Sequence, residues 1–99
     1  MQEVKVVYEF KIPLVAIQVF SQIMRQMVKD HKEQIVKGII IVDITDDNKT
    51  VTTTVRDDQT LMEDFRRGIG SWRGARDRTY LRVAGMKAKL FIDGKEEKF

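Results

Sequence analysis

The spacing of apolar residues changes at Pro13, and this change constrains the fold more than any other feature of the sequence. Before it, apolar side chains recur at every second position of Val4–Ile12, the pattern of a half-buried strand. After it, from Leu14 to about Lys37, they recur at helical spacing. Proline is tolerated in the first turn of a helix, and Gly38 is a typical residue after a helix end. The pattern therefore predicts a strand followed by a long helix.

The same patterns predict which side chains of these two elements enter the core. The inward residues of the strand are Val4, Val6, Tyr8, Phe10 and Ile12. The apolar stripe of the helix consists of Ile17, Phe20, Ile23, Met24, Met27, Val28, His31 and Ile35. Because His31 is the chain's only histidine and no partner residue is evident, we interpret it as a boundary residue of the core.

A hairpin is predicted for residues 39–56. Two β-branched runs, Ile39–Thr45 and Thr50–Arg56, flank the polar sequence DDNK at positions 46–49, which favours a turn. Period two then directs one set of side chains inward, namely Ile40, Val42 and Ile44 with Val51, Thr53 and Val55.

A second, shorter helix is predicted after the hairpin. Thr60 and Glu63 have the spacing of a capping box, and Gly68 favours an end near Arg67. The glycine-rich residues 68–77 that follow show no clear periodicity.

Alternation returns in the last third of the chain. It predicts strands over Thr79–Val83 and residues 87–92, the second with Ala88, Leu90 and Ile92 inward. Asp93-Gly94 is a strong turn signal, so the final KEEKF sequence is expected to add a short edge strand.

The order of these elements indicates an α+β fold in a single domain of residues 1–99. We predict a two-layer sandwich in βαββαβ order, a ferredoxin-like variant. An antiparallel sheet of four to five strands carries one long and one short helix on one face. The other face is left open, and function is expected there.

Composition narrows the classes of protein. Apolar residues make up 42% of the chain and charged residues 33%, which is typical of a globular domain. No segment resembles a membrane span or a signal peptide. The chain has no cysteine, which excludes a disulfide scaffold and thiolate metal sites and favours a reducing compartment. We therefore expect a cytoplasmic protein that does not bind membranes and needs no cofactor.

Charge is distributed unevenly along the chain. Residues 43–64 contain seven acids and two bases, whereas residues 66–82 contain six of the eight arginines and one acid. Arginine donates two hydrogen bonds to phosphate and keeps its charge, and aromatic rings stack on bases. The leading hypothesis is therefore a small non-enzymatic protein, expected to form a homodimer, that binds nucleic acid, DNA or RNA. The candidate residues are Arg66, Arg67, Trp72, Arg73, Arg76, Arg78, Tyr80, Arg82, Lys87 and Lys89.

Two alternatives stay open. Large apolar residues are predicted on the outward side of the sheet: Val7, Ile39, Ile41 and Phe91. They indicate either a protein-protein interaction module that dimerises through the open sheet face or a one-residue error in strand phase. The acids at positions 43, 46, 47, 57 and 58 raise a metal-dependent nuclease as the second alternative, although turns and helix caps explain most of them. No catalytic residue and no metal ligand is therefore assigned.

Overall fold

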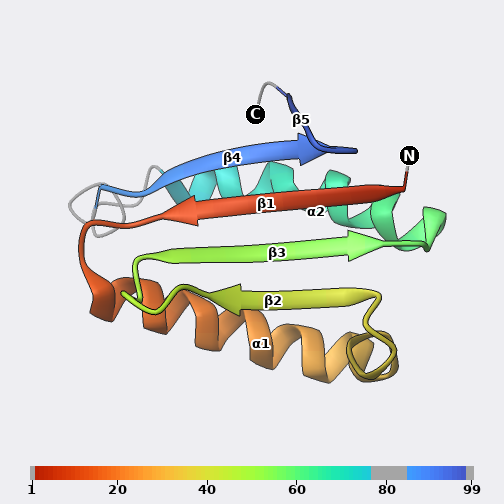
Figure 1. Cartoon of the computed structure of the whole chain (residues 1–99), viewed down its shortest axis with the longest axis horizontal. Coiled ribbons are helices and arrows are strands. Elements are labelled where there is room, and N and C mark those ends of the chain that lie inside the picture. Colours follow the sequence, from red (N-terminus) through yellow and green to blue (C-terminus); the bar gives the residue numbers. More distant parts are fainter. Residues whose placement is uncertain (1, 77–84, 98–99) are drawn as a thin grey trace.

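The computed structural model describes the backbone of residues 2–76 and 85–97 and the side chains of residues 2–67 and 85–97. In this part of the chain, five antiparallel strands form one sheet in the order β2-β3-β1-β4-β5, with both helices on one face (Figure 1). The elements are β1 Glu3–Glu9, α1 Pro13–Val36, β2 Ile40–Ile44, β3 Thr50–Arg56, α2 Gln59–Arg76, β4 Lys87–Ile92 and β5 Lys95–Glu97. The α+β two-layer fold class is confirmed, and the strand order is compatible with the predicted ferredoxin-like arrangement.

Strand β1 lies in the middle of the sheet and pairs with β3 on one side and β4 on the other. Val4, Val6 and Tyr8 are buried on its helix-covered side, as the alternation predicts. Phe10 is also buried, but Ile12 is 40% exposed. The prediction for Ile12 is wrong because β1 ends at Glu9, so the period of the strand no longer sets the direction of later side chains.

The predicted hairpin is present, with its expected phase. Inward residues of β2 and β3 lie opposite one another in the pairs Ile40–Val55, Val42–Thr53 and Ile44–Val51. In the connecting turn, the Asp47 carboxylate accepts hydrogen bonds from the Thr45 hydroxyl (2.6 Å) and the Lys49 N–H (3.0 Å). These hydrogen bonds lower the pKa of Asp47, because they stabilise its charged form.

Helix α1 packs over β2 and β3, but its buried face is rotated from the predicted stripe. Ala16, Val19 and Ile23 are buried, whereas Ile17 and Val28 are 39% and 45% exposed. The prediction for Ile17 and Val28 is wrong because apolar residues occupy more than half of this helix's circumference. Period alone then identifies a helix but not the side that meets the sheet.

The C-terminus of α1 ends as predicted, at the Lys37-Gly38 sequence. Gly38 has φ +74°, and its N–H donates to the Ile35 carbonyl (3.1 Å). The Ile39 N–H donates to the Gln34 carbonyl (2.9 Å), which completes a Schellman motif. A side chain at residue 38 would be strained in this left-handed conformation.

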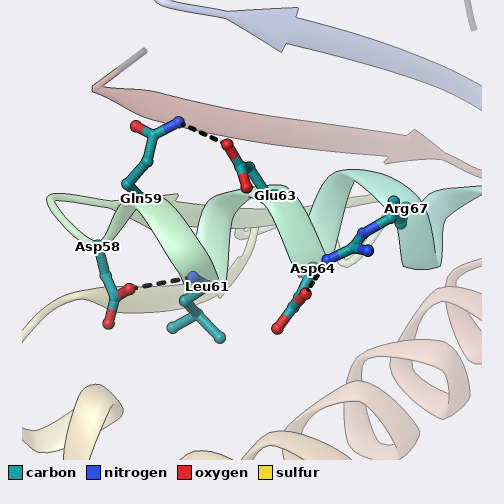
Figure 2. Close-up of polar contacts among 6 residues, drawn as sticks. All are labelled: Asp58, Gln59, Leu61, Glu63, Asp64 and Arg67. Atoms are coloured by element: carbon teal, nitrogen blue, oxygen red, sulfur yellow. Dashed lines mark hydrogen bonds and ion pairs between the residues drawn. The ribbon is translucent and has the colours of Figure 1, made fainter.

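Helix α2 begins earlier than predicted. The Asp58 carboxylate accepts a hydrogen bond from the Leu61 N–H (3.0 Å), so Asp58 is the N-cap (Figure 2). Gln59 Nε2 donates to Glu63 Oε1 (3.1 Å) along the first turn. The capping box predicted at Thr60 is therefore wrong. Asp58, the residue directly before the helix, supplies the cap, and Thr60 lies within the helix.

Helix α2 also ends later than predicted. It continues through Gly68, Gly70 and Gly74 to Arg76, so the predicted end near Arg67 is wrong. Glycine within a helix costs only about 1 kcal/mol relative to alanine, which is too little to stop a helix by itself. The predicted strand Thr79–Val83 lies outside the described residues.

The core lies between the sheet and the two helices. Its buried residues are Val4, Val6, Tyr8 and Phe10; Ala16, Val19 and Ile23 of α1; and Ile40, Val51, Val55, Met62 and Leu90. The Asp93-Gly94 turn and the edge strand β5 that follow β4 are present as predicted. None of the helices in the described part of the chain is long and apolar enough to cross a membrane.

One side chain departs from the apolar character of this core. Thr53 is 2% exposed, and its hydroxyl has no hydrogen-bond partner among the described residues. Burying a hydroxyl without a partner costs about 1–3 kcal/mol. The adjacent inward residues of β3, Val51 and Val55, are apolar and equally buried.

Candidate functional site

The candidate site is the open face of the sheet, the side that the helices do not cover (Figure 1). Every described strand except the short edge strand β5 contributes at least two side chains to the candidate site. The open face consists of Glu3, Lys5, Val7 and Glu9; Ile41 and Asp43; Thr50, Thr52, Thr54 and Arg56; Lys87, Lys89 and Phe91; and Glu96. These residues alternate with the inward residues of the same strands, so pleating directs them away from the helices; Thr54 among them is only 6% exposed.

Strand pairing arranges these side chains in transverse rows. The first row runs across the sheet as Ile41, Thr54, Lys5, Phe91 and Glu96. The second row runs as Asp43, Thr52, Val7 and Lys89. In both rows, directly opposed residues on neighbouring strands have Cβ atoms about 5 Å apart, so their side chains are in contact range.

The apolar residues predicted on the outward side therefore do occupy outward-facing positions of their strands. Val7, Ile41 and Phe91 are half-buried on the open face, and Ile39 is half-buried just before β2 begins. A one-residue phase error, which would have moved them to the core, is excluded for these strands. The open face thus carries partly exposed apolar side chains next to charged ones.

Positive charge on this face is concentrated at β1 and β4. Lys5, Lys87 and Lys89 lie there, and the acids on the same face nearby are Glu3 and Glu9 of β1 and Glu96 of β5, which lies opposite Phe91. Lys89 Nζ lies 3.8 Å from Glu9 Oε1, and the two side chains are 46% and 43% exposed. Such an exposed pair contributes about 0–1 kcal/mol, because water screens it. On the same face, at the other edge of the sheet, Asp43 is exposed on β2.

The structure divides the predicted nucleic-acid residues between two layers. Lys87 and Lys89 lie together on the open face, whereas Arg66 and Arg67 are exposed on α2 in the helix layer. Arg67 forms an ion pair with Asp64 on the preceding turn (Figure 2). Of the remaining candidates, Trp72, Arg73 and Arg76 belong to the last turns of α2, while Arg78, Tyr80 and Arg82 lie outside the described residues.

The residues predicted to bind nucleic acid did not include Lys5. Lys5 lies directly opposite Phe91 across the β1–β4 pair. The signal that identifies Lys5 is the predicted sheet order, because that order makes β1 and β4 neighbours and places Lys5 outward by alternation. Adding it gives three lysines on the strand pair that carries Phe91: Lys5 directly opposite the ring, and Lys89 and Lys87 two and four residues before it on β4.

The acids considered for a metal site have structural roles or lie apart. Asp47 organises the β2–β3 turn, Asp58 caps α2, and Asp43 lies on the open face. Asp57 has φ +60°, a backbone conformation that aspartate tolerates better than most residues. Within the described part of the chain, no three His, Asp or Glu side chains come together in a way that could hold a metal ion.

Comparison of the chain with protein-family models, curated proteins and solved structures gives no match.

Proposed function

We propose that this protein binds single-stranded nucleic acid on the open face of its sheet and catalyses no reaction. The observation that carries the proposal is the cluster on β1 and β4, where Phe91 lies opposite Lys5 and on the same side of β4 as Lys89 and Lys87. Lysines at this spacing can follow a phosphate backbone while the ring stacks on a base. An uncovered antiparallel sheet supplies the flat surface that such stacking needs.

The arginine-rich stretch extends this track of positive charge. Arg76 is the last residue of α2, and residues 77–86 connect it directly to Lys87 at the start of β4. Arg78 and Arg82 therefore precede the lysine cluster in the chain, with Tyr80 between them as a second stacking ring. We propose that these residues continue the binding surface beyond the edge of the sheet, whereas Arg66 and Arg67, in the helix layer, lie outside it.

The test is fluorescence anisotropy with labelled single-stranded RNA and DNA of about 12 nucleotides, a length within the range one small domain covers, over a series of salt concentrations. The parent is compared with Lys87→Ala/Lys89→Ala. We expect affinity to fall about tenfold and the salt slope to decrease by roughly 0.7 for each lost phosphate contact. Phe91→Leu keeps an apolar side chain but removes the stacking ring, and we expect weaker binding with an unchanged salt slope.

A matched control removes two lysines from the other side of the molecule. Lys29 and Lys32 are both exposed on α1, so Lys29→Ala/Lys32→Ala changes the net charge equally without changing the open face. Its salt slope should equal that of the parent. Equal losses in the two double variants, or absence of binding at low salt, would contradict the proposal. A larger loss in Arg66→Ala/Arg67→Ala would place the binding surface on the helix layer instead.

A second candidate function is a protein-protein interaction module that dimerises through the open face. It is favoured by the complementarity of the transverse rows. A two-fold axis parallel to the strands, between β3 and β1, reverses each row and brings β2 of one copy over β4 of the other. Asp43 then opposes Lys89 of the second copy, and Ile41 opposes its Phe91.

Both candidates require Phe91 and Lys89, so a nucleic acid and a second copy would compete for the same face. Light scattering over a range of protein concentrations measures the molar mass directly. A dimer that dissociates when oligonucleotide is added supports both functions for one surface. A monomer at the highest concentration contradicts the dimer and leaves the open face for nucleic acid.

A further inference from the structure

A cavity of about 240 Å³ lies on the helix-covered side of the sheet, opposite the face proposed for nucleic acid. The two helices pack over different strands, α1 over β2 and β3 and α2 over β3 and β1, and the cavity lies between them. Its lining comes from both helices and from two strands. The lining residues are Tyr8, Gln22, Ile23, Gln26, Met27, Thr53 and Phe65.

The polar groups of this cavity are few. None of the lining residues is an acid, lysine, arginine or histidine, and Ile23, Met27 and Phe65 make much of the wall apolar. At the exposed rim, Gln26 donates a hydrogen bond to Asp30 on the next turn of α1, and Gln22 lies one turn before it. Burial raises the pKa of Tyr8, so its ring carries a neutral hydroxyl at physiological pH. Among the described lining residues, a charged ligand would find no partner.

Thr53 is the feature that packing does not explain. Its neighbours across the sheet on the same face are Val6 and Val42, and its hydroxyl is buried without a partner among the described residues. Valine has nearly the same shape and would fill this position without burying a polar atom. The hydroxyl borders the cavity, where a molecule inside could hydrogen-bond to it. A polar group at the base of an apolar cavity is the usual arrangement in small-molecule sites.

We propose that this cavity is a binding site for a small neutral aromatic molecule that carries one hydrogen-bonding group, which pairs with the Thr53 hydroxyl. The volume limits the size of the ligand. It exceeds the roughly 150 Å³ of an apolar protein cavity that accepts benzene, and it lies below the roughly 300–1,000 Å³ of drug-sized sites. A molecule of one or two rings therefore matches the space.

The test uses two probes that differ only in a hydroxyl, 2-naphthol and naphthalene. Each is titrated into the full chain with carbon-13-labelled methionine methyl groups, and the NMR shift of Met27 at the cavity is followed. We expect 2-naphthol to move the Met27 signal and to bind more tightly than naphthalene. In Thr53→Val, we expect the affinity for 2-naphthol to fall about fivefold to tenfold, the value for one net hydrogen bond, and that for naphthalene to be unchanged.

Thr53→Val preserves shape, so it is expected to fold, and its melting temperature should rise because an unpaired buried hydroxyl is removed. Thr54→Val is the matched control, since Thr54 is the next residue of β3 and lies on the opposite face. It should leave both affinities unchanged. The proposal fails if neither probe shifts Met27 up to its solubility limit, which would indicate that the cavity holds only water. It also fails if Thr53→Val binds 2-naphthol as tightly as the parent.

Discussion

The two faces of this sheet are built from the same strands but have opposite character. On the covered face, Val4, Val6, Val51 and Val55 are at most 1% exposed. One residue away on each strand, the open face carries lysines, acids, threonines and only a few half-buried apolar groups. Adjacent residues of one strand thus have different roles: one stabilises the fold, and the next is available for binding. Substitutions on the covered face should change the free energy of unfolding, and substitutions on the open face should change what the protein binds.

The largest expected effect compares Ile40→Ala with Ile41→Ala. Ile40 is 2% exposed on the covered face, and its truncation should lower the free energy of unfolding by about 2–5 kcal/mol through lost burial and a residual cavity. Ile41 is half-buried on the open face, and we expect a loss of about 1 kcal/mol or less. Urea unfolding at low protein concentration measures both. Equal losses would show that the open face is covered even in the monomer.

Reversing the charge of Asp43 or Lys89 tests whether the open face forms the dimer interface. If two copies pack as the rows indicate, Asp43→Lys should raise the dimer dissociation constant about tenfold, about 1.4 kcal/mol, because two ammonium groups would then oppose each other. Lys89→Asp should have a similar effect, and the double variant Asp43→Lys/Lys89→Asp should restore the dimer. Sedimentation equilibrium measures the constants. Asp46→Lys makes the same charge change in the turn and serves as control.

The substitution Asp43→Lys also distinguishes nucleic-acid binding from dimerisation. Without a dimer, Asp43→Lys adds two positive charge units to the nucleic-acid face, and oligonucleotide affinity should increase with a steeper salt dependence. Unchanged affinity in Asp43→Lys, together with a lost dimer, would favour the interaction module over nucleic-acid binding.

A smaller effect is expected at the cap of α2, the helix that covers β1 and β3. Asp58→Ala removes the acceptor for the Leu61 N–H and should lower the free energy of unfolding by about 1 kcal/mol. Asp57→Asn is a suitable control, because asparagine also tolerates the left-handed backbone at that position. Thermal unfolding followed by circular dichroism compares the two variants. A cap at Thr60 would instead make Thr60→Ala the more damaging change.

The smallest effect is expected at Asp93, where the Asp93 carboxylate accepts hydrogen bonds from the backbone N–H groups of Gln2 (2.7 Å) and Glu3 (2.9 Å). These bonds lower the pKa of Asp93 from its ordinary value of 3.8. Because the folded-state value is the lower one, the stabilisation is present above the unfolded-state pKa and is lost as pH falls through the folded-state pKa.

Asp93→Asn keeps a hydrogen-bond acceptor but cannot ionise. Its melting temperature should lie below that of the parent at neutral pH and approach it as pH falls below the ordinary aspartate value. Melting curves at a series of pH values test this. Parallel curves for parent and variant would show that ionisation of Asp93 does not contribute.

The sequence predicted the strands better than the helices, for a physical reason. Alternation in β1 through β4 leaves only two directions for a side chain, so period two alone assigns Val7 and Phe91 to the open face. In a helix, side chains point in all directions around the axis. Helix α1 carries apolar residues such as Leu14 and Ile17 on sides that the sheet does not cover. The extension of α2 was not predictable because Gly68 favours a helix end locally, whereas tertiary packing decides whether the helix continues.

In the candidate site too, some residues are predictable from the pattern of one strand, and others depend on tertiary packing. Lys87, Lys89 and Phe91 could be grouped from one strand's alternation. Lys5 requires knowledge of which strands are neighbours, and the separation of Arg66 and Arg67 onto the other layer depends on where α2 packs. Thr53 could be placed inward, but only three-dimensional packing shows that its hydroxyl has no partner among the described residues.

The central place of β1 has a consequence for synthesis on the ribosome. This strand leaves the ribosome before the others, yet one of its two neighbours, β4, comes after more than eighty residues of chain. Until then, the hydrogen-bonding edge of β1 that β4 later covers remains open. Nascent chains with an unpaired apolar strand edge readily associate with one another. Slowing translation between α2 and β4 should therefore increase aggregation, and faster completion of β4 should suppress it.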